Sequence, residues 1–248
     1  MWELDPFAVL GPAGVIQLLI NEFLYDTKPS YTVNSASDLH QALKDCNFGD
    51  CNLLTADVNV ETHLQVDGCR LQGAHVGASN ARRPSITTHR GPLLVANAMV
   101  EGLNLTTGDE EQFNPDNCFP GVEASGTCGA LLRRCCITSY QGTTLMACCC
   151  GIVAEDCGVS SNGCFLGAVV RDDDGPSSGP GFLSMRGCAV EDNAWGAFLG
   201  KDTPAGVKRA MLAANTFRRN SHEDITEIYS YTGQRVQPWR RGWDSAKP

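Results

Sequence analysis

The chain has few charged residues, and basic ones are in the minority. Of its 248 residues, 19 are Lys or Arg and 28 are Asp or Glu, which gives a net charge of −9 and an isoelectric point near 5.0. Nucleic acid binding depends on basic side chains that neutralise phosphates, so this balance argues against a nucleic acid as the main partner. Hydrophobic residues make up 42% of the chain, enough to bury the core of one elongated domain.

Long apolar runs and a basic N-terminal region are also missing. No apolar stretch approaches the length of a membrane span. Glu3 and Asp5 lie where a secretory signal would carry Lys or Arg. We therefore expect no transmembrane segment, and a location in the cytosol or in an organelle interior after removal of a targeting peptide.

Cysteine, by contrast, is abundant, with 13 residues. Several are contiguous, in residues 135–136 and 148–150, and neighbouring strand residues point to opposite faces. Such runs match neither a disulfide framework nor the paired spacing of a structural zinc site, so we expect mostly reduced thiols in a reducing compartment. Two pairs would close local loops in an oxidising compartment: Cys46 with Cys51, and Cys118 with Cys128.

One short pattern occurs four times in residues 131–220. In each unit an apolar segment is followed by a Cys or Asn and then by a second apolar position. The first column consists of Cys135, Cys157, Cys188 and Asn215, and the second of Ile137, Val159, Val190 and Phe217. An asparagine column three positions further on consists of Asn162, Asn193 and Asn220. Spacings of 22, 31 and 27 residues between successive members of the first column show a loose period, which together with short β-rich units is the signature of a solenoid.

Each unit is too short to bury a face alone. Stacking the units about 4.8 Å apart pairs every strand with its copy and creates a continuous core. In such a stack the cysteine column packs as small buried residues, and the asparagine column forms a ladder at a turn. Two strands and their turns per unit predict a right-handed parallel β-helix.

With these columns, residues 31–228 resemble the pectate-lyase-like superfamily of right-handed parallel β-helix proteins. The pattern extends towards the N-terminus, where Cys69 and Leu103 are expected to occupy the column of Cys135. The resemblance implies an all-β solenoid fold. It is specific for the architecture and matches no particular enzyme family.

The sequence before the repeats divides into an arm and a cap. Residues 1–30 form an arm with a short amphipathic helix, whose apolar stripe consists of Val15, Leu18, Leu19 and Phe23. A second helix at about residues 35–45 begins with the capping spacing of Ser35 and Asp38. As in the superfamily, it is expected to cover the open end of the stack, and with it begins the β-helix domain of residues 31–228.

Residues 229–248 form a tail after the last repeat. The tail is basic and aromatic around Trp239, Arg240, Arg241 and Trp243. Because Trp and Arg are typical anchors of protein interfaces, these four residues and the stripe of the arm are the candidate partner-binding residues.

Three insertions interrupt the repeats, at residues 108–121, 171–181 and 201–209. In solenoids such insertions project from the stack and often bind ligands. The second insertion carries Asp172, Asp173 and Asp174 directly after Arg171, and three carboxylates in a Gly- and Pro-rich loop are a candidate Ca²⁺ site. A solvated acidic loop is the alternative interpretation.

The catalytic signatures of the superfamily are largely missing. Its hydrolases combine an Asp-Asp pair with later Gly-His-Gly and Arg-x-Lys elements, and only Asp172-Asp173 resembles that set. The Arg-x-Pro-x-x-Arg element of its lyases is absent, since Arg82-Arg83-Pro84 leads to Thr87. The five histidines are scattered, so no catalytic residue is assigned.

Two functional hypotheses remain. In the first, the chain is a non-catalytic scaffold or accessory subunit without cofactor that binds protein partners in a larger assembly, such as a photosynthetic or respiratory complex of an organelle. In the second, it is a carbohydrate-active lyase, hydrolase, epimerase or binding protein for acidic glycans, with Ca²⁺ as a possible cofactor and the site near Arg171. A row of exposed aromatic rings with converging carboxylates would favour the second.

Overall fold

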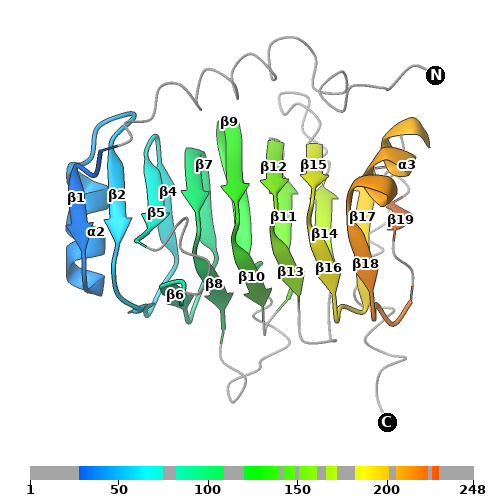
Figure 1. The fold of residues 1–248 in the computed structure, drawn as a ribbon, viewed down its shortest axis with the longest axis horizontal. Coiled ribbons are helices and arrows are strands. Elements are labelled where there is room, and N and C mark those ends of the chain that lie inside the picture. The colour runs from blue at the N-terminus through cyan, green and yellow to red at the C-terminus, as the bar shows by residue number, and fades with distance from the viewer. Residues whose placement is uncertain are drawn as a thin grey trace, which may run out of the picture.

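The computed structural model describes residues 28–74, 82–108, 120–139, 142–148, 151–160, 166–171, 182–200, 205–222 and 225–228. Within these residues every strand pairing is parallel, in one twelve-stranded and one seven-stranded sheet. Successive coils lie side by side along the long axis of the molecule (Figure 1). Because parallel crossovers are right-handed almost without exception, the chain is a right-handed parallel β-helix, as the repeats predict.

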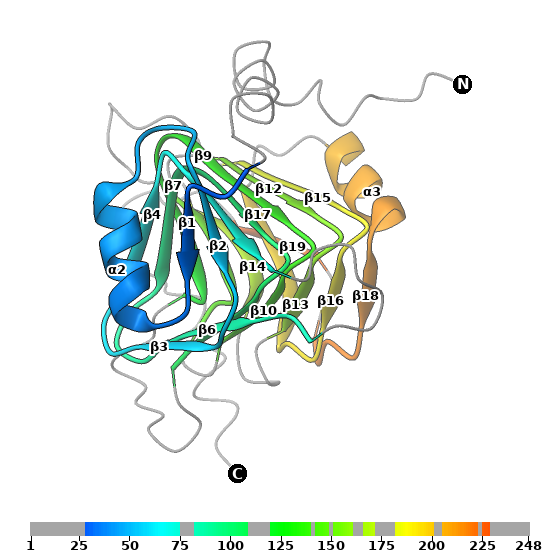
Figure 2. The ribbon, with the colours of Figure 1, turned by 60° about the vertical axis from the view of Figure 1, so that its left-hand side comes forward.

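The larger sheet forms two of the three faces of the helix (Figure 2). The first face consists of β4 (Leu64–Asp67), the start of β7 (Leu93–Glu101), the start of β9 (Val122–Arg133), β11 (Leu145–Cys148), β14 (Leu166–Arg171), β17 (Trp195–Gly200) and β19 (Ile225–Ile228). The second face consists of β1 (Tyr31–Val33), β2 (Cys51–Leu54), β5 (Arg70–Gly73), the ends of β7 and β9, β12 (Gly151–Glu155) and β15 (Phe182–Arg186). The long strands change face at Asn97 and Gly129, where φ is positive.

The smaller sheet is the third face. It consists of β3 (Val58–Val60), β6 (Ser85–Thr88), β8 (Asn104–Thr107), β10 (Cys136–Ser139), β13 (Gly158–Ser160), β16 (Ala189–Glu191) and β18 (Thr216–Arg218). Its inward column contains Ile137, Val159 and Val190, all 0–1% exposed, and the pairing register continues that column to Phe217. The predicted second column of the repeat is therefore confirmed.

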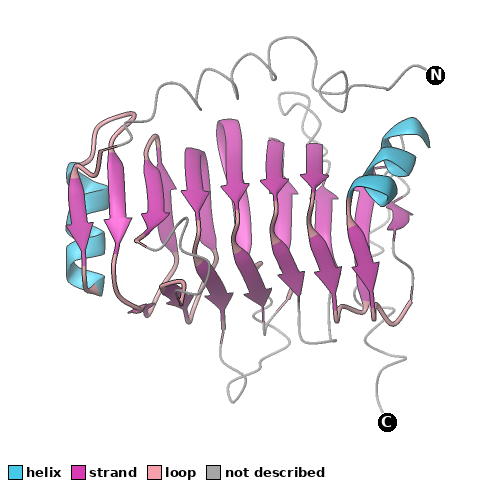
Figure 3. Cartoon of the chain, in the orientation of Figure 1, coloured by secondary structure: helices cyan, strands magenta, loops and turns pink. Residues whose placement is uncertain are grey.

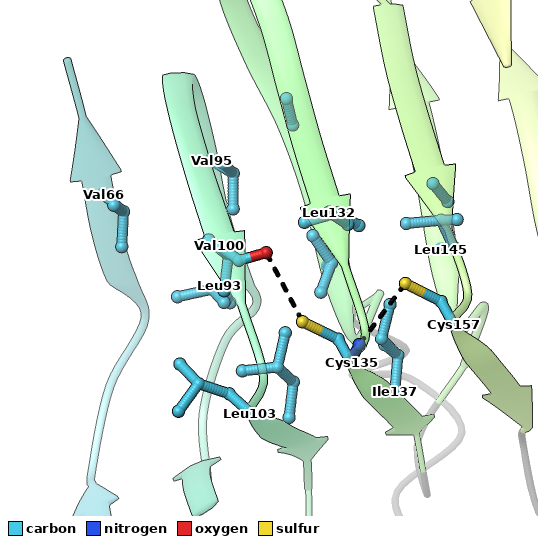
Figure 4. Packing of buried hydrophobic residues seen from close by; sticks show 14 of the residues in the cluster. Val66, Leu93, Val95, Val100, Leu103, Leu132, Cys135, Ile137, Leu145 and Cys157 are labelled. Atoms are coloured by element: carbon cyan, nitrogen blue, oxygen red, sulfur yellow. Dashed lines mark hydrogen bonds between the residues drawn. The ribbon is translucent and has the colours of Figure 1, made fainter. Parts of the chain in front are cut away.

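The turn between the second and third faces carries the cysteine column. The N–H groups of Cys135 and Cys157 donate to the Sγ atoms of Cys157 and Cys188 over 3.5 and 3.4 Å, and the N–H of Cys188 donates to Oδ1 of Asn215 over 2.9 Å. The thiol of Cys135 donates to the carbonyl of Val100, and Figure 4 shows it among the core residues. Each member thus bonds the next coil, and all seven cysteines whose thiols the structure describes are free.

A second ladder lies at the turn from the third to the first face. Asn193 donates from Nδ2 to Oδ1 of Asn220 over 3.1 Å, and Asn220 donates to the carbonyl of Val190 over 3.1 Å. These bonds confirm the asparagine ladder for two of its three members, whereas Asn162 lies outside the described residues.

The placement of Cys69 in the Cys135 column is wrong. Arg70 pairs with Met99, which places Cys69 beside Ala98 at the corner between the first and second faces. The error arises because the same local turn, a left-handed glycine followed by cysteine, occurs at both corners: Gly68 precedes Cys69 and Gly187 precedes Cys188. Leu103 does lie in the column, since Asn104 pairs with Cys136.

Two helices cover the ends of the stack (Figure 3). Helix α2 (Ala36–Asp45) packs on β1–β4, and Ser35 caps it by accepting a hydrogen bond from the N–H of Asp38 over 3.1 Å, which confirms the predicted cap. Helix α3 (Ala205–Ala214) packs on β15 and β18. Residues 211–214, which precede Asn215 in the fourth unit of the repeat, are thus helical, in agreement with their Ala, Leu and Met content.

The insertions do not share one corner. Residues 109–119 connect the third face to the first, whereas residues 172–181 connect the first face to the second. The sequence leaves open which face the insertions share, and the topology places these two at different corners of the helix.

Candidate functional site

The outer surface of the second face carries a row of alternating charges. The register aligns outward residues of successive coils in the order Gln72, Glu101, Arg133, Glu155 and Arg186. We call these residues the charged row. Because paired strands lie about 4.8 Å apart, the row presents one side chain per coil along the axis of the helix.

Glu101 is the most buried member of the charged row. Its side chain is 1% exposed and forms ion pairs with the guanidinium groups of both Arg70 and Arg134. Burial alone would raise the pKa of Glu101, but the hydrogen bonds and charges of Arg134 and Arg70 outweigh it and hold the pKa below its ordinary value. Glu101 is therefore an ionised anchor and not a proton donor at neutral pH.

The basic side chains around this anchor outnumber its carboxylate. Arg134 remains 44% exposed although it is paired, and Arg133 bonds Glu155 over 2.9 Å. Arg186, at the end of the charged row, is exposed and makes no ion pair with the described residues. The surface can thus attract anions locally, within a protein of net charge −9.

An uncharged row runs along the adjoining third face. It consists of Thr87, Thr106, Thr138 and Ser160, which occupy one outward column in register. The hydroxyl groups of Thr138 and Ser160 lie 3.3 Å apart. At the edge of this face, Arg83 donates to the exposed thiol of Cys136 over 3.0 Å, which places another cation near the charged row.

The remaining ion pairs of the described residues lie elsewhere. Arg218 holds Glu191 at 2.7 Å, and Arg219 holds both Asp192 and Glu191 at 2.6 Å. The hydrogen bond of Arg218 lowers the pKa of Glu191, and that of Arg219 lowers the pKa of Asp192. No group of His, Cys, Asp and Glu in the part of the chain that the structure describes is arranged to hold a metal ion.

The candidate partner-binding and metal-binding residues all lie outside the described residues. These are the stripe Val15, Leu18, Leu19 and Phe23, the tail residues Trp239, Arg240, Arg241 and Trp243, and the proposed calcium ligands Asp172, Asp173 and Asp174. The stripe, the tail and the calcium site therefore stay predictions.

The charged row was missed by the sequence reasoning, although its signal was present. Glu101, Arg133, Glu155 and Arg186 each lie two residues before a member of the Cys135 column. Reading that position down the aligned repeats gives charges of alternating sign, which is the pattern of a cross-strand ion-pair ladder.

Comparison with known proteins finds similar folds at low similarity. No family model and no curated protein matches the chain. An alginate lyase from Paenibacillus sp. str. FPU-7 is 12% identical with a TM-score of 0.41, over 77% of this chain and 76% of the lyase. A pectin methylesterase from Aspergillus niger is 11% identical with a TM-score of 0.43, over 88% of this chain and 97% of the esterase. At these values neither activity nor substrate transfers to this chain.

None of the described helices has the length and apolar character needed to cross a membrane.

Proposed function

We propose that the protein binds acidic glycans along the edge between its second and third faces. The observation that carries this proposal is the line of arginine side chains at that edge, with Arg186 exposed and lacking an ion pair in the described part of the chain. Guanidinium groups match carboxylates in bidentate geometry, so uronate units are suitable ligands.

The spacing of the coils supports an extended ligand. Neighbouring coils place their side chains about 4.8 Å apart, a distance comparable with one sugar unit of a stretched polysaccharide. The hydroxyl row Thr87, Thr106, Thr138 and Ser160 lies on the adjoining face and offers neutral donors and acceptors for sugar hydroxyls.

The carboxylates of the charged row favour glycan binding over glycan cleavage. Glu101 and Glu155 are both engaged by arginines, and acid–base catalysis on a sugar needs a pair of carboxyl groups that can act on the ligand. A lyase, hydrolase or epimerase activity would have to draw on residues such as Asp172, which lie outside the described residues.

The test is a titration of the protein with polygalacturonate and with uncharged dextran. Arg186→Gln is expected to weaken polygalacturonate binding about 10- to 150-fold, the range for the loss of one charge-assisted contact. Lys44→Gln, which removes the same charge from the exposed side of α2, is expected to leave binding unchanged. Equal binding of dextran, or equal loss in both variants, would refute the proposal. An assay for new reducing ends in the same mixtures detects cleavage.

The scaffold function is the second candidate. It stays a prediction, because Met99, Leu131 and Val153 on the outside of the second face are already nearly inaccessible to solvent within this chain and leave no free apolar surface there. Gentle purification followed by native mass spectrometry tests it: a defined assembly that includes other chains supports the scaffold, and a free monomer contradicts it.

A further inference from the structure

Three apolar residues on the outside of the second face form a cluster separate from the core. Met99, Leu131 and Val153 align in register on successive coils, and we call them the apolar row. Their chain neighbours, such as Val100 and Leu132, belong to the core, and alternate residues of a strand point to opposite faces. The apolar row therefore points away from the core.

The burial of the apolar row shows that this face is covered. The three residues are 3%, 6% and 7% exposed, whereas outward residues such as Thr106 on the third face are half-buried. The two described helices lie at the ends of the stack, α2 against β1–β4 and α3 against β15 and β18 (Figure 1). Neither of these helices packs on the middle of the second face, so neither accounts for the burial of the apolar row.

We propose that residues 1–27 provide this cover, with the stripe Val15, Leu18, Leu19 and Phe23 packed on the apolar row. This inference is independent of the proposed glycan binding. The segment leads directly into β1, which is the edge strand of the second face, so it starts beside the surface in question.

The dimensions of the segment agree with the surface. Residues 15–27 span about 20 Å as a helix. The path from β1 across β2, β5, β7 and β9 to β12 contains five strand spacings, or about 24 Å. A segment that runs along this path brings Phe23 near Met99 and Val15 near Val153.

The charges of the segment are also complementary to the surface. Residues 1–27 contain Glu3, Asp5, Glu22 and Asp26 and no Lys or Arg. On the same path lies Arg70, which shares the outward column of Met99 and whose buried Nε–H has no acceptor. Among the acidic residues of the segment, Glu22 and Asp26 are nearest in sequence to β1 and therefore the ones that can lie beside Arg70.

Other segments fit the apolar row less well. Residues 75–81, 149–150 and 172–181 also join the second face. The first of these leaves β5 at its end towards the third face, whereas Met99 is aligned with the start of β5; the second is only two residues long; and the third is polar, rich in Asp, Ser, Gly and Pro. The tail of residues 229–248 follows β19 on the first face and is basic, so it would meet the arginines with like charge.

Site-specific photo-crosslinking in the full-length chain tests the cover. A benzophenone side chain is placed at Phe23 or Val15, with Gln17 on the opposite side of the helix as the control position. Irradiation is expected to join position 23 to the peptide of Met99 and position 15 to the peptide of Val153, with several-fold lower yield from position 17. The same experiment on a mixture of isotopically light and heavy chains separates crosslinks within one chain from crosslinks between chains. Each product is expected to contain two light or two heavy peptides, and none a light and a heavy one. Crosslinks to another face, reversed order, mixed products or no crosslink would each overturn the proposal.

Thermal unfolding of the full-length chain provides a second test. Leu18→Asp and Leu131→Ala are each expected to lower the midpoint by several degrees, and the double variant by little more than the larger single effect, because both remove one contact. Leu18→Asp with Thr106→Ala on the third face is the additive control. Additive shifts for Leu18 and Leu131 would contradict the cover.

Discussion

At the scale of single residues, Glu101 determines the electrostatics of the second face. It brings together two guanidinium groups from neighbouring parts of the helix, Arg70 on β5 and Arg134 at the following turn. A charge that is 1% exposed is tolerated only because both partners are present. Removing it leaves two arginines close to each other without their common counter-ion.

Glu101→Gln should therefore reduce the free energy of unfolding by about 2–4 kcal/mol, the range for breaking a mostly buried ion pair. The matched control is Glu155→Gln in the same row, which should cost no more than about 1 kcal/mol because that pair is more exposed to solvent. Urea denaturation measures both. Equal costs would mean that the two arginines do not depend on Glu101.

The lowered pKa of Glu101 also predicts how the stability of the protein depends on pH. Its pKa in the folded chain lies below the ordinary value of 4.5, so the stability it contributes is complete above that value and is lost as the pH falls through the folded-state pKa. Wild-type stability should decline in the acid range more steeply than that of Glu101→Gln. Parallel curves would contradict the ion-pair assignment.

At the scale of elements, the two turn ladders hold the coils in register. Cys188 accepts from the N–H of Cys157 and donates to the carbonyl of Ala154, and Asn215 makes the equivalent bonds one coil later. The hydrogen bond with Cys157 and burial both raise the pKa of Cys188, which keeps the thiol protonated as this donor role requires. The cysteine column is thus a hydrogen-bonding device as well as a packing one.

Cys188→Ala should cost about 1–3 kcal/mol, since it leaves a buried N–H and a buried carbonyl without this partner. Cys188→Asn repeats the chemistry of Asn215 in the same column and should cost less. Thermal or urea unfolding of the two variants decides the point. A larger loss for Asn than for Ala would show that volume, and not hydrogen bonding, governs the column.

At the scale of the whole molecule, the repeats in the sequence were sufficient to predict the β-helix and its N-terminal cap. The stacked columns of Ile137 and Asn193 identify turns and inward positions without reference to distant contacts. The corner at which a turn occurs was harder to predict, as Cys69 shows, because the glycine–cysteine turn is the same at two corners. The repeats also predict only two strands per coil, whereas the structure has three faces. The additional face could not be recognised in the sequence because β7 and β9 run continuously through the first and second faces.

The candidate site was predictable only in part. The alternation of charge at Glu101, Arg133, Glu155 and Arg186 is visible once the units are aligned. The convergence of Arg70 and Arg134 on one carboxylate, however, depends on the three-dimensional register. A motif such as Asp172-Asp173-Asp174 consists of residues that are adjacent in sequence. In a solenoid, the residues that share a surface are one coil apart.

The most direct test of the central claim is the thermal unfolding midpoint of the protein in the presence of polygalacturonate and of dextran at equal sugar concentration. A ligand that binds the folded chain stabilises it by mass action, so polygalacturonate should raise the midpoint and added salt should diminish the rise. Dextran should have no effect. An unchanged midpoint with polygalacturonate, or the same rise with both polymers, would contradict an anionic glycan site on the β-helix.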